Sequence, residues 1–411
     1  MQEIHLFILW ENALYKKQEI LKDMQESFDI LGMYNITWSK EKFSENLSRF
    51  YGTNLPKGCG KEEHCGNGTF LLVVVRCNNP KYEDRDTSKG IQRVNTSMFD
   101  KKTYYRELTG GGHRVHATNS EIETNHDLTL LLGKSINDFV KENNSWDGNE
   151  INLQNDLFGA NGWNDAKEMF YALNNCINYA LLRNYETLPE EIYVNEHNDI
   201  DIICDSFENV AYVLNAKKVF NEEYRVHYKA MVGQGFANFD LRYIGDDYYF
   251  KQLEEDLLKT KIYNEKGFYT ISNDYYFYTL LYHALLHKPS FSEDYKNRLS
   301  KMNKEFENLE NEQQYLEMLQ KWLIQNEYIV TKPIDKSVQF NKENAKRLSP
   351  LVYRDNSNME EAIIQNEELK NAGYHHPLFF IHHYCAFALV ILSAASKMPS
   401  LPDSYVRPPC I

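Results

Sequence analysis

The sequence predicts an α+β protein in which an N-terminal α/β domain is followed by a mixed-sheet domain and a helical C-terminal region. Its 411 residues suffice for two or three domains at roughly 150 residues each. Hydrophobic residues make up 42% and charged residues 25%, a balance that excludes a disordered or fibrous chain. Strand and helix patterns are interleaved over the first two thirds, and the last third shows helical spacing. We expect domains at residues 1–142, 150–270 and 271–411.

The first domain is expected to alternate strands and helices. Ile4–Leu9 is an apolar run typical of a buried strand, and Lys16–Leu31 carries apolar residues at helical spacing. Phe70–Val75 is continuously apolar, which predicts a strand covered on both faces. A helix is expected to begin near Ser120, which caps it while Glu123 completes a capping box.

Residues 143–149 are rich in turn-forming residues and poor in apolar ones, so we place a domain boundary there. Beyond it, Trp163–Leu182 has the spacing of a helix. Asp199–Ile203 and Ala237–Ile244 read as strands. Asp274–Asn326 is helical throughout, and its charged later part is expected to face solvent.

Charge and cysteine content favour a cytoplasmic protein that does not bind nucleic acids in general. Lys and Arg total 45 against 59 Asp and Glu, and the resulting net charge of −14 repels a phosphate backbone. Seven cysteines are too few and odd in number for a disulfide scaffold. The N-terminal residues lack the pattern of a signal peptide. Leu378–Ala395 is largely apolar, but His382 and His383 interrupt it, so we expect a buried helix and no transmembrane span.

The most informative motif is Asp199-Ile-Asp201, which begins a predicted strand. Side chains alternate along a strand, so both carboxylates project from one face. Their mutual repulsion is relieved if a divalent cation bridges them, and Mg²⁺ prefers carboxylate oxygens. Asp240 in the next convincing strand is the expected third metal ligand or general base. The alternative is that the acid pair is simply solvated at a strand edge.

These acids occur in a context that resembles the nucleotidyltransferase superfamily related to DNA polymerase β. In that superfamily a helix, here Met169–Leu182, and a loop, here beginning at Arg183-Asn184, precede the Asp-x-Asp strand, and a third Asp follows. The segment Asp274–Lys288 is similar to the helical segment after the catalytic sheet in a group of uncharacterised bacterial nucleotidyltransferases. The acids are also similar to those of LicD and fukutin-like phosphotransferases. The resemblance covers Trp163–Met302, about a third of the chain.

The resemblance implies a Mg²⁺-dependent enzyme that transfers a nucleotidyl or phospho group to a small-molecule or glycan acceptor, as in cell-envelope polysaccharide synthesis. The Gly-Gly/Ser that contacts the triphosphate in the family is replaced by Arg183-Asn184. Arg183 is able to bind phosphate by a different route, as a bidentate fork. The alternative is a non-catalytic ligand-binding or toxin–antitoxin-type module that keeps the fold and has lost the glycines.

Further candidate substrate-binding residues follow the acids. Arg242 shares a strand face with Asp240, where it either contacts substrate phosphate or forms a structural ion pair. His283 and His287 are four residues apart on one helix face, a spacing that favours packing or substrate contact over zinc. Lys288 either reaches a phosphate or complements the helix dipole.

A glycine-rich segment in the first domain is a second candidate ligand loop. Gly110, Gly111 and Gly112 precede His113 and Arg114. Consecutive glycines let backbone N–H groups approach an anion, and the two side chains add positive charge. We therefore name Gly111, Gly112, His113 and Arg114 as candidate substrate-binding residues, with a plain loop as the alternative.

Overall fold

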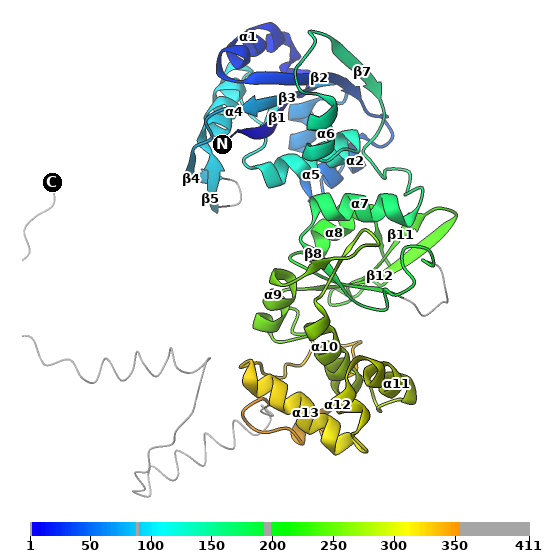
Figure 1. Cartoon of the computed structure of the whole chain (residues 1–411). Coiled ribbons are helices and arrows are strands. Elements are labelled where there is room, and N and C mark those ends of the chain that lie inside the picture. The colour runs from blue at the N-terminus through cyan, green and yellow to red at the C-terminus, as the bar shows by residue number, and fades with distance from the viewer. Residues whose placement is uncertain (1, 88–89, 193–198, 354–411) are drawn as a thin grey trace, which may run out of the picture. The chain divides into compact units, whose positions relative to one another are not determined.

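The first sheet has five strands in the order β6–β1–β3–β2–β7 (Figure 1). The computed structural model describes residues 2–87, 90–192 and 199–353. The strands of this sheet are β1 (Glu3–Leu9), β2 (Asp29–Thr37), β3 (Phe70–Cys77), β6 (Val115–Ala117) and β7 (Glu150–Gln154). β1, β2, β3 and β6 pair antiparallel, whereas β2 and β7 are parallel. The sheet is therefore mixed.

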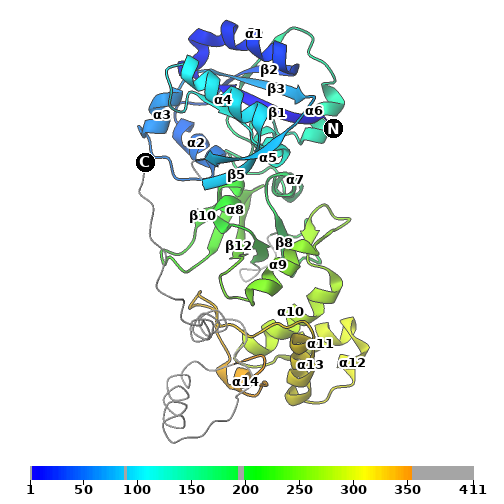
Figure 2. The ribbon, with the colours of Figure 1, turned by 90° about the vertical axis from the view of Figure 1, so that its left-hand side faces the viewer.

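Helices cover both faces of this sheet, as the continuous apolar run of β3 predicts (Figure 2). On one face, Ile20 and Met24 of α1 and Tyr105 of α4 pack against odd-numbered β1 residues such as Phe7. On the other face, helices α2, α5 and α6 pack against even-numbered residues of β1. The elements around the sheet are η1 (Glu11–Lys16), α1 (Lys17–Ser27), α2 (Phe43–Tyr51), α3 (Gly60–Cys65), α4 (Thr96–Leu108), α5 (Glu121–Leu132), α6 (Ile136–Glu142) and the hairpin of β4 (Tyr82–Thr87) and β5 (Gly90–Asn95).

The first predicted helix is too long at its C-terminal end. Helix α1 ends at Ser27, and Phe28 is extended, with φ −142° and ψ 154°. Leu31, which has helical spacing, instead lies in β2 and is buried in the sheet. The apolar residues at the start of β2 happen to continue the helical spacing of α1. Periodicity alone therefore did not locate the boundary between the helix and the strand.

The predicted cap of helix α5 is confirmed. Ser120 Oγ accepts a hydrogen bond from the backbone N–H of Glu123 at 3.3 Å. The Glu123 carboxylate accepts from the backbone N–H of Asn119 at 2.6 Å, one residue before the partner that a capping box uses. The N-terminus of α5 is thus fixed from both sides.

The first sheet extends past the predicted boundary at residues 143–149. β7 begins at Glu150, inside the range expected for the second domain, and pairs with β2 through Met33↔Glu150. The turn-rich stretch therefore joins helix α6 to the last strand of the same sheet. Residues 1–354 cluster as one compact unit, and residues 355–411, which include the predicted helix at 378–395, lie outside the described residues.

The second sheet has seven strands in the order β10–β11–β12–β9–β8–β14–β13. β9 pairs parallel with β12 and antiparallel with β8, so this sheet is mixed as predicted. Its strands are β8 (Tyr179–Arg183), β9 (Ile200–Cys204), β10 (Lys217–Lys218), β11 (His227–Val232), β12 (Gly235–Tyr243), β13 (Ile262–Tyr263) and β14 (Tyr269–Thr270). Helices α7 (Ala166–Cys176), α8 (Phe207–Leu214) and α9 (Lys251–Lys259) contribute to its core.

The helix expected over Trp163–Leu182 is wrong at both ends. Helix α7 ends at Cys176, and Ile177 is extended. Asn residues and a β-branched isoleucine around this point are poor helix formers, and the next residues gain hydrogen bonds by pairing with β9. Arg183 is consequently the last residue of β8 and not the first of a loop.

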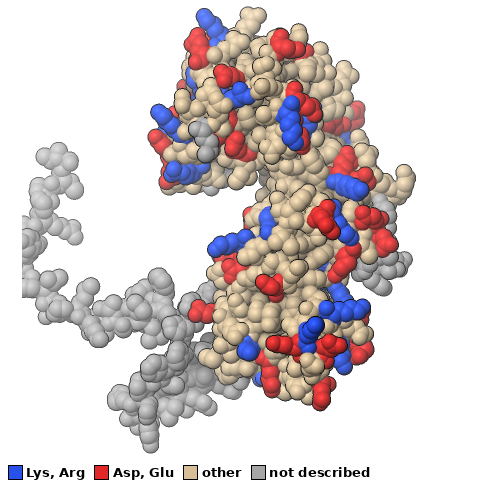
Figure 3. All heavy atoms as spheres, viewed as in Figure 1, with Lys and Arg blue, Asp and Glu red and all other residues tan. Residues whose placement is uncertain are grey.

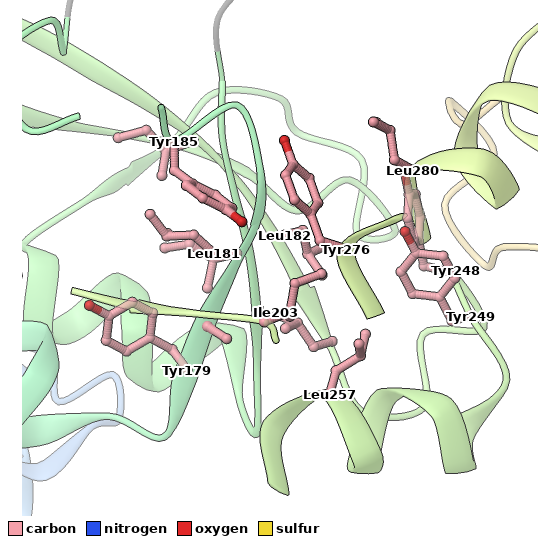
Figure 4. Packing of buried hydrophobic residues seen from close by; sticks show 14 of the residues in the cluster. Tyr179, Leu181, Leu182, Tyr185, Ile203, Tyr248, Tyr249, Leu257, Tyr276 and Leu280 are labelled. Atoms are coloured by element: carbon pink, nitrogen blue, oxygen red, sulfur yellow. The ribbon is translucent and has the colours of Figure 1, made fainter. Parts of the chain in front are cut away.

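The described part of the region after residue 270 is built of helices, as the spacing over Asp274–Asn326 predicts. It contains α10 (Asn273–Leu286), α11 (Glu293–Met302), α12 (Lys304–Glu307), α13 (Glu312–Gln325) and α14 (Lys342–Lys346). Helix α10 is buried along most of its length and joins the core of the second sheet. Figure 4 shows part of this core, where the ring centroids of Tyr185 and Tyr276 are 5.1 Å apart. Within the described residues, no helix has the length and apolar content needed to cross a membrane.

The two sheets are joined through a buried arginine. Arg49 of α2 donates from Nε to the carbonyl of Tyr212 at 3.0 Å and from Nη2 to that of Val213 at 3.0 Å. Both carbonyls belong to the C-terminal turn of α8, where helix carbonyls have few intrahelical partners, and that of Tyr212 also accepts from the backbone N–H of Asn215 at 3.2 Å. A third bond joins Nη2 to the carbonyl of Phe158 at 2.8 Å. Arg49 thus caps α8 from the neighbouring layer.

Candidate functional site

Two parallel strands bring the predicted acids to the same level of the second sheet. Asp201 of β9 and Asp240 of β12 are register partners, and both are buried, with 6% and 7% exposure. Asp199 immediately precedes β9 and is half-buried. The negative charge of Asp240 raises the pKa of Asp199, an effect second to that of burial. The three acids predicted from sequence therefore form one electrostatic group.

Arg183 and Asn184 contact the central acid of this group. Arg183 faces Asp201 across the β8–β9 pair, with 2.5 Å between Nη2 and Oδ1. Asn184 Nδ2 donates to the other carboxylate oxygen, Oδ2, at 3.4 Å. Asn184 has a φ of 59°, a left-handed conformation that Asn tolerates better than most residues. The two residues that stand in place of the glycine motif, Arg183 and Asn184, thus place a guanidinium group and a side-chain amide against the carboxylate of Asp201.

Arg242 provides a second ion-pair centre beside the first. Its Nη2 lies 2.9 Å from Asp240 Oδ2 and 3.3 Å from Asp335 Oδ2, and its Nη1 lies 3.8 Å from Asp246 Oδ2. Sequence reasoning predicted the Arg242–Asp240 proximity and missed Asp246 and Asp335. Asp246 follows β12 closely, so its position after the strand was a usable signal. Asp335 lies outside any helix or strand, and no sequence pattern links it to β12.

The group carries more negative than positive charge. Five carboxylates interact with three guanidinium groups: those of Arg183 and Arg242, and that of Arg225, whose charge acts on Asp199. Burial raises the pKa of Asp201 to about 6, although Arg183 opposes that shift. Asp240 Oδ1 is buried and has no hydrogen-bond partner among the described residues. An unpartnered carboxylate oxygen in an excess of negative charge favours binding of a cation. The five carboxylates belong to Asp199, Asp201, Asp240, Asp246 and Asp335.

The carboxylates are hard oxygen donors of the kind that Mg²⁺ prefers, and in this respect the site fits the predicted ion. The oxygens of Asp199, Asp201 and Asp240 do not, however, all lie within 4.8 Å of one another. The three ligands predicted for Mg²⁺ are thus neighbours without being arranged as a closed coordination shell.

Another set of residues has that closer spacing. Among the described residues, His116, Glu123 and Asp127 form the single group of three whose potential ligand atoms lie within 4.8 Å. Asp127 accepts from His116 Nε2 at 2.8 Å and contacts His126 Nδ1 at 2.9 Å. Glu123 is the carboxylate that fixes the start of α5. Sequence reasoning did not identify this group as a metal site, and these contacts give its members a structural role.

A buried Tyr–His wall packs against the two arginines. Tyr248 OH lies 2.7 Å from His283 Nδ1, and the His287 ring centroid is 4.3 Å from that of Tyr248. The guanidinium carbons of Arg242 and Arg183 lie 4.6 and 5.6 Å from the centroid of the Tyr248 ring.

Burial lowers the pKa of His283 and His287 well below 6.5, and the arginines lower it further, so both imidazoles are neutral at pH 7. The predicted His283 thus lies beside the acid–arginine group. Lys288, just beyond α10, is close enough for its charge to lower the pKa of both histidines. Its side chain is half-buried.

The predicted glycine loop belongs to the first sheet and not to the acid-bearing sheet. Gly111, Gly112, His113 and Arg114 lie between α4 and β6. The backbone N–H of Trp10, which follows β1, donates to the carbonyl of Arg114 at 3.0 Å. The two candidate sites from the sequence are therefore carried by different sheets.

No protein-family model matches the chain, and no curated protein sequence matches it.

Proposed function

We propose that this chain is a Mg²⁺-dependent transferase that moves a nucleotidyl or phospho group onto a small-molecule or glycan acceptor. The observation that carries the proposal is the pairing of Asp201 with Asp240 across parallel strands, with Asp199 next to them. Carboxylates gathered on adjacent strands are what phosphoryl-group transfer requires to hold metal ions.

The residues have distinct roles in this proposal. Asp199 and Asp201 hold Mg²⁺, and Asp240, whose Oδ1 has no hydrogen-bond partner, is the third ligand or the general base. When bound, Mg²⁺ neutralises charge on the phosphate and activates the oxygen nucleophile. Arg183, Asn184 and Arg242 position phosphate oxygens, since a guanidinium offers paired donors that match phosphate. His283 and Lys288 complete the substrate-binding side.

The charge of the chain supports a small-molecule or glycan acceptor over a nucleic acid. The net charge is −14, and acidic and basic side chains are interspersed on the face seen in Figure 3. A polyanion would need a continuous basic surface to overcome this charge. A role in cell-envelope polysaccharide synthesis on the cytoplasmic side is consistent with such an acceptor.

A second candidate function, a ligand-binding module without catalysis, is favoured by the two contacts that Asp201 makes with protein groups. Both oxygens of Asp201 are engaged by protein groups, Oδ1 by Arg183 at 2.5 Å and Oδ2 by Asn184 at 3.4 Å. An arginine that neutralises the central acid substitutes for a metal ion in balancing buried charge. In this function Asp201 serves the fold and does not bind Mg²⁺.

Thermal unfolding with a panel of ligands separates the two functions. Wild type, Asp199→Asn and Asp201→Asn are melted with nucleoside triphosphates, CDP-polyols and sugar nucleotides, each with Mg²⁺ or EDTA. A ligand that binds the native state raises the melting temperature by mass action. The control is Asp205→Asn, because Asp205 is exposed just beyond β9 and contacts Asn178.

The transferase predicts a rise in melting temperature with at least one donor that requires Mg²⁺, is lost in Asp201→Asn and is kept in Asp205→Asn. A rise that needs no Mg²⁺ and persists in Asp201→Asn would instead establish the binding module. No rise with any donor would contradict the transferase.

A further inference from the structure

A row of four side chains crosses the second sheet at the level of the predicted acids. His227 of β11 is the register partner of Asp240, and Asp240 is the partner of Asp201. Asp201 in turn pairs with Arg183 of β8. Side chains at paired positions project from the same face of a sheet. The two acids are therefore flanked by Arg183 on one side and by His227 on the other.

Arg225 extends this polar face next to His227. The β11–β12 ladder continues one residue before β11, because the backbone N–H of Leu241 donates to the carbonyl of Val226 at 3.0 Å. Side chains alternate along this extended segment, so Arg225 shares a face with His227, and the buried Val226 lies on the other face. Both polar side chains are half-buried and stand beside the acid-bearing strand β12.

The two side chains act electrostatically on the acid next to this row, Asp199. Burial and the negative charge of Asp240 raise the pKa of Asp199. The charges of His227, Arg183 and Arg225 oppose that shift. His227 and Arg225 are thus close enough to belong to the surroundings of the proposed metal ligands.

Buried polar atoms without a hydrogen-bond partner recur along this face. Among the described residues they include Asp240 Oδ1, Arg183 Nη1, His227 Nδ1 and Arg225 Nε. An unsatisfied polar atom is costly in a buried position, and such atoms are rare in native proteins. Their concentration beside the acids indicates that a polar ligand completes this face.

Phe220, in the turn between β10 and β11, packs against both side chains. The guanidinium carbon of Arg225 lies 3.6 Å from the centroid of the Phe220 ring, and the ring centroids of His227 and Phe220 are 5.6 Å apart. Stacking on an aromatic ring orients a guanidinium through its flat face and does not use its N–H donors. Phe220 therefore positions Arg225 for an additional partner.

We propose that Arg225 and His227 bind the pyrophosphate group of a nucleotide donor beside Asp199, Asp201 and Asp240, an inference that rests on the proposed function. Arg183, which stands in place of the glycine motif, already donates from Nη2 to Asp201. The phosphate oxygens therefore need further donors, and a guanidinium matches them geometrically. Nucleoside triphosphates, CDP-polyols and sugar nucleotides all contain a pyrophosphate group.

Isothermal titration calorimetry tests this assignment without measuring turnover. Pyrophosphate, ATP, CDP-glycerol and UDP-glucose are each titrated, with Mg²⁺ or with EDTA, into wild type and four variants. Arg225→Gln removes the guanidinium. His227→Gln removes the polar atom at the position of Nδ1, whereas His227→Asn keeps a side-chain amide near it.

Lys218→Gln is the matched control. It removes an exposed lysine charge from the same hairpin, at a position paired with Tyr228. Tyr228 belongs to the opposite face of β11, where its ring centroid lies 6.2 Å from that of Phe207 in α8. Melting temperatures of all variants show whether they are folded.

We expect pyrophosphate and at least one nucleotide to bind wild type, and to bind Arg225→Gln and His227→Gln about tenfold more weakly. His227→Asn and Lys218→Gln should bind close to wild type. The nucleotide that binds most tightly identifies the donor class. The inference is overturned if none of the four ligands binds wild type at millimolar concentration.

Two results separate this inference from the proposed function. Binding that is lost in Asp201→Asn but unchanged in folded Arg225→Gln and His227→Gln would overturn the inference and leave the transferase standing. Pyrophosphate binding that requires Arg225 and His227, but neither Mg²⁺ nor the Asp201 carboxylate, would support the inference and count against the transferase.

Discussion

Arg242 of β12 and Asp335, which are 93 residues apart, form an almost fully buried ion pair. Their Nη2 and Oδ2 atoms are 3.3 Å apart, and their exposed fractions are 1% and 2%. Asp335 also accepts from the backbone N–H of Ser337 at 2.8 Å and from its hydroxyl at 2.5 Å. This carboxylate therefore ties the segment after α13 to the acid-bearing sheet.

Replacing Asp335 by Ala should destabilise the protein by about 3 kcal/mol, because one side of a buried charge pair is removed. Urea unfolding of Asp335→Ala measures the loss. Asp84→Ala is the control, since Asp84 is exposed on the β4–β5 hairpin and should cost far less. Equal free energies of unfolding for the two variants would show that the pair contributes nothing.

Arg49→Lys should weaken the junction between the two sheets. A lysine has one compact donor group and cannot reproduce the three carbonyl contacts of the guanidinium. We expect a loss of about 2 kcal/mol in urea unfolding, since buried carbonyls lose their partners. Lys217→Gln removes the exposed ion pair of Lys217 with Glu45 between the same two parts and should change little. A greater loss for Lys217→Gln than for Arg49→Lys would contradict this account.

The stability of the protein should fall between pH 4.5 and pH 9 because of Glu254. Burial and the negative charge of Asp246 raise the pKa of Glu254 from 4.5 to about 9. The folded state therefore holds a proton that the unfolded chain releases near pH 4.5, and folding is opposed increasingly as the pH rises through this window.

Glu254→Gln should remove that part of the pH dependence. Its amide oxygen can still accept one of the hydrogen bonds that Gly245 and Tyr249 now donate. Melting temperatures from pH 5 to pH 9 should fall less steeply than in wild type, by about 2 °C or more. Glu255→Gln, at a neighbouring and only partly buried position, should keep the wild-type slope. Identical slopes for all three proteins would refute the raised pKa of Glu254.

Tyr248→Phe should cost about 1–2 kcal/mol, because His283 Nδ1 loses its 2.7 Å hydrogen bond in a buried position. Thermal unfolding measures the loss, and Tyr104→Phe is the control because Tyr104 is exposed to solvent. Equal melting temperatures for the two variants would show that the Tyr248 hydroxyl does not stabilise the Tyr–His wall.

The acid-bearing strands were predictable because they carry two patterns at once. In β12 apolar residues alternate with Asn238, Asp240 and Arg242, and in β9 Asp201 lies between two buried isoleucines, so both strands follow from local patterns, whereas Asp199 lies just before β9. The register that places Asp201 beside Asp240 is a property of strand pairing, which no local pattern specifies.

The errors have a common physical cause. The helix expected up to Leu182 ends early because β8 gains partners from β9, and β7 joins the first sheet through contacts with β2 more than a hundred residues away. Asp335 likewise reaches Arg242 only through the tertiary fold. The spacing of residues along the chain carries no information about which distant segments pair. It therefore placed the helix end and the domain boundary wrongly and did not predict the contact between Asp335 and Arg242.

The position of β7 has a consequence for where the chain can be divided. It covers the outer edge of β2. The turn-rich residues 143–149 immediately before it are where a shortened N-terminal fragment would naturally be ended. An N-terminal fragment that stopped there would leave the backbone N–H and C=O groups along the edge of β2 unpaired. Open strand edges recruit other chains, so such a fragment should self-associate, whereas one extended through Gln154 keeps that edge protected.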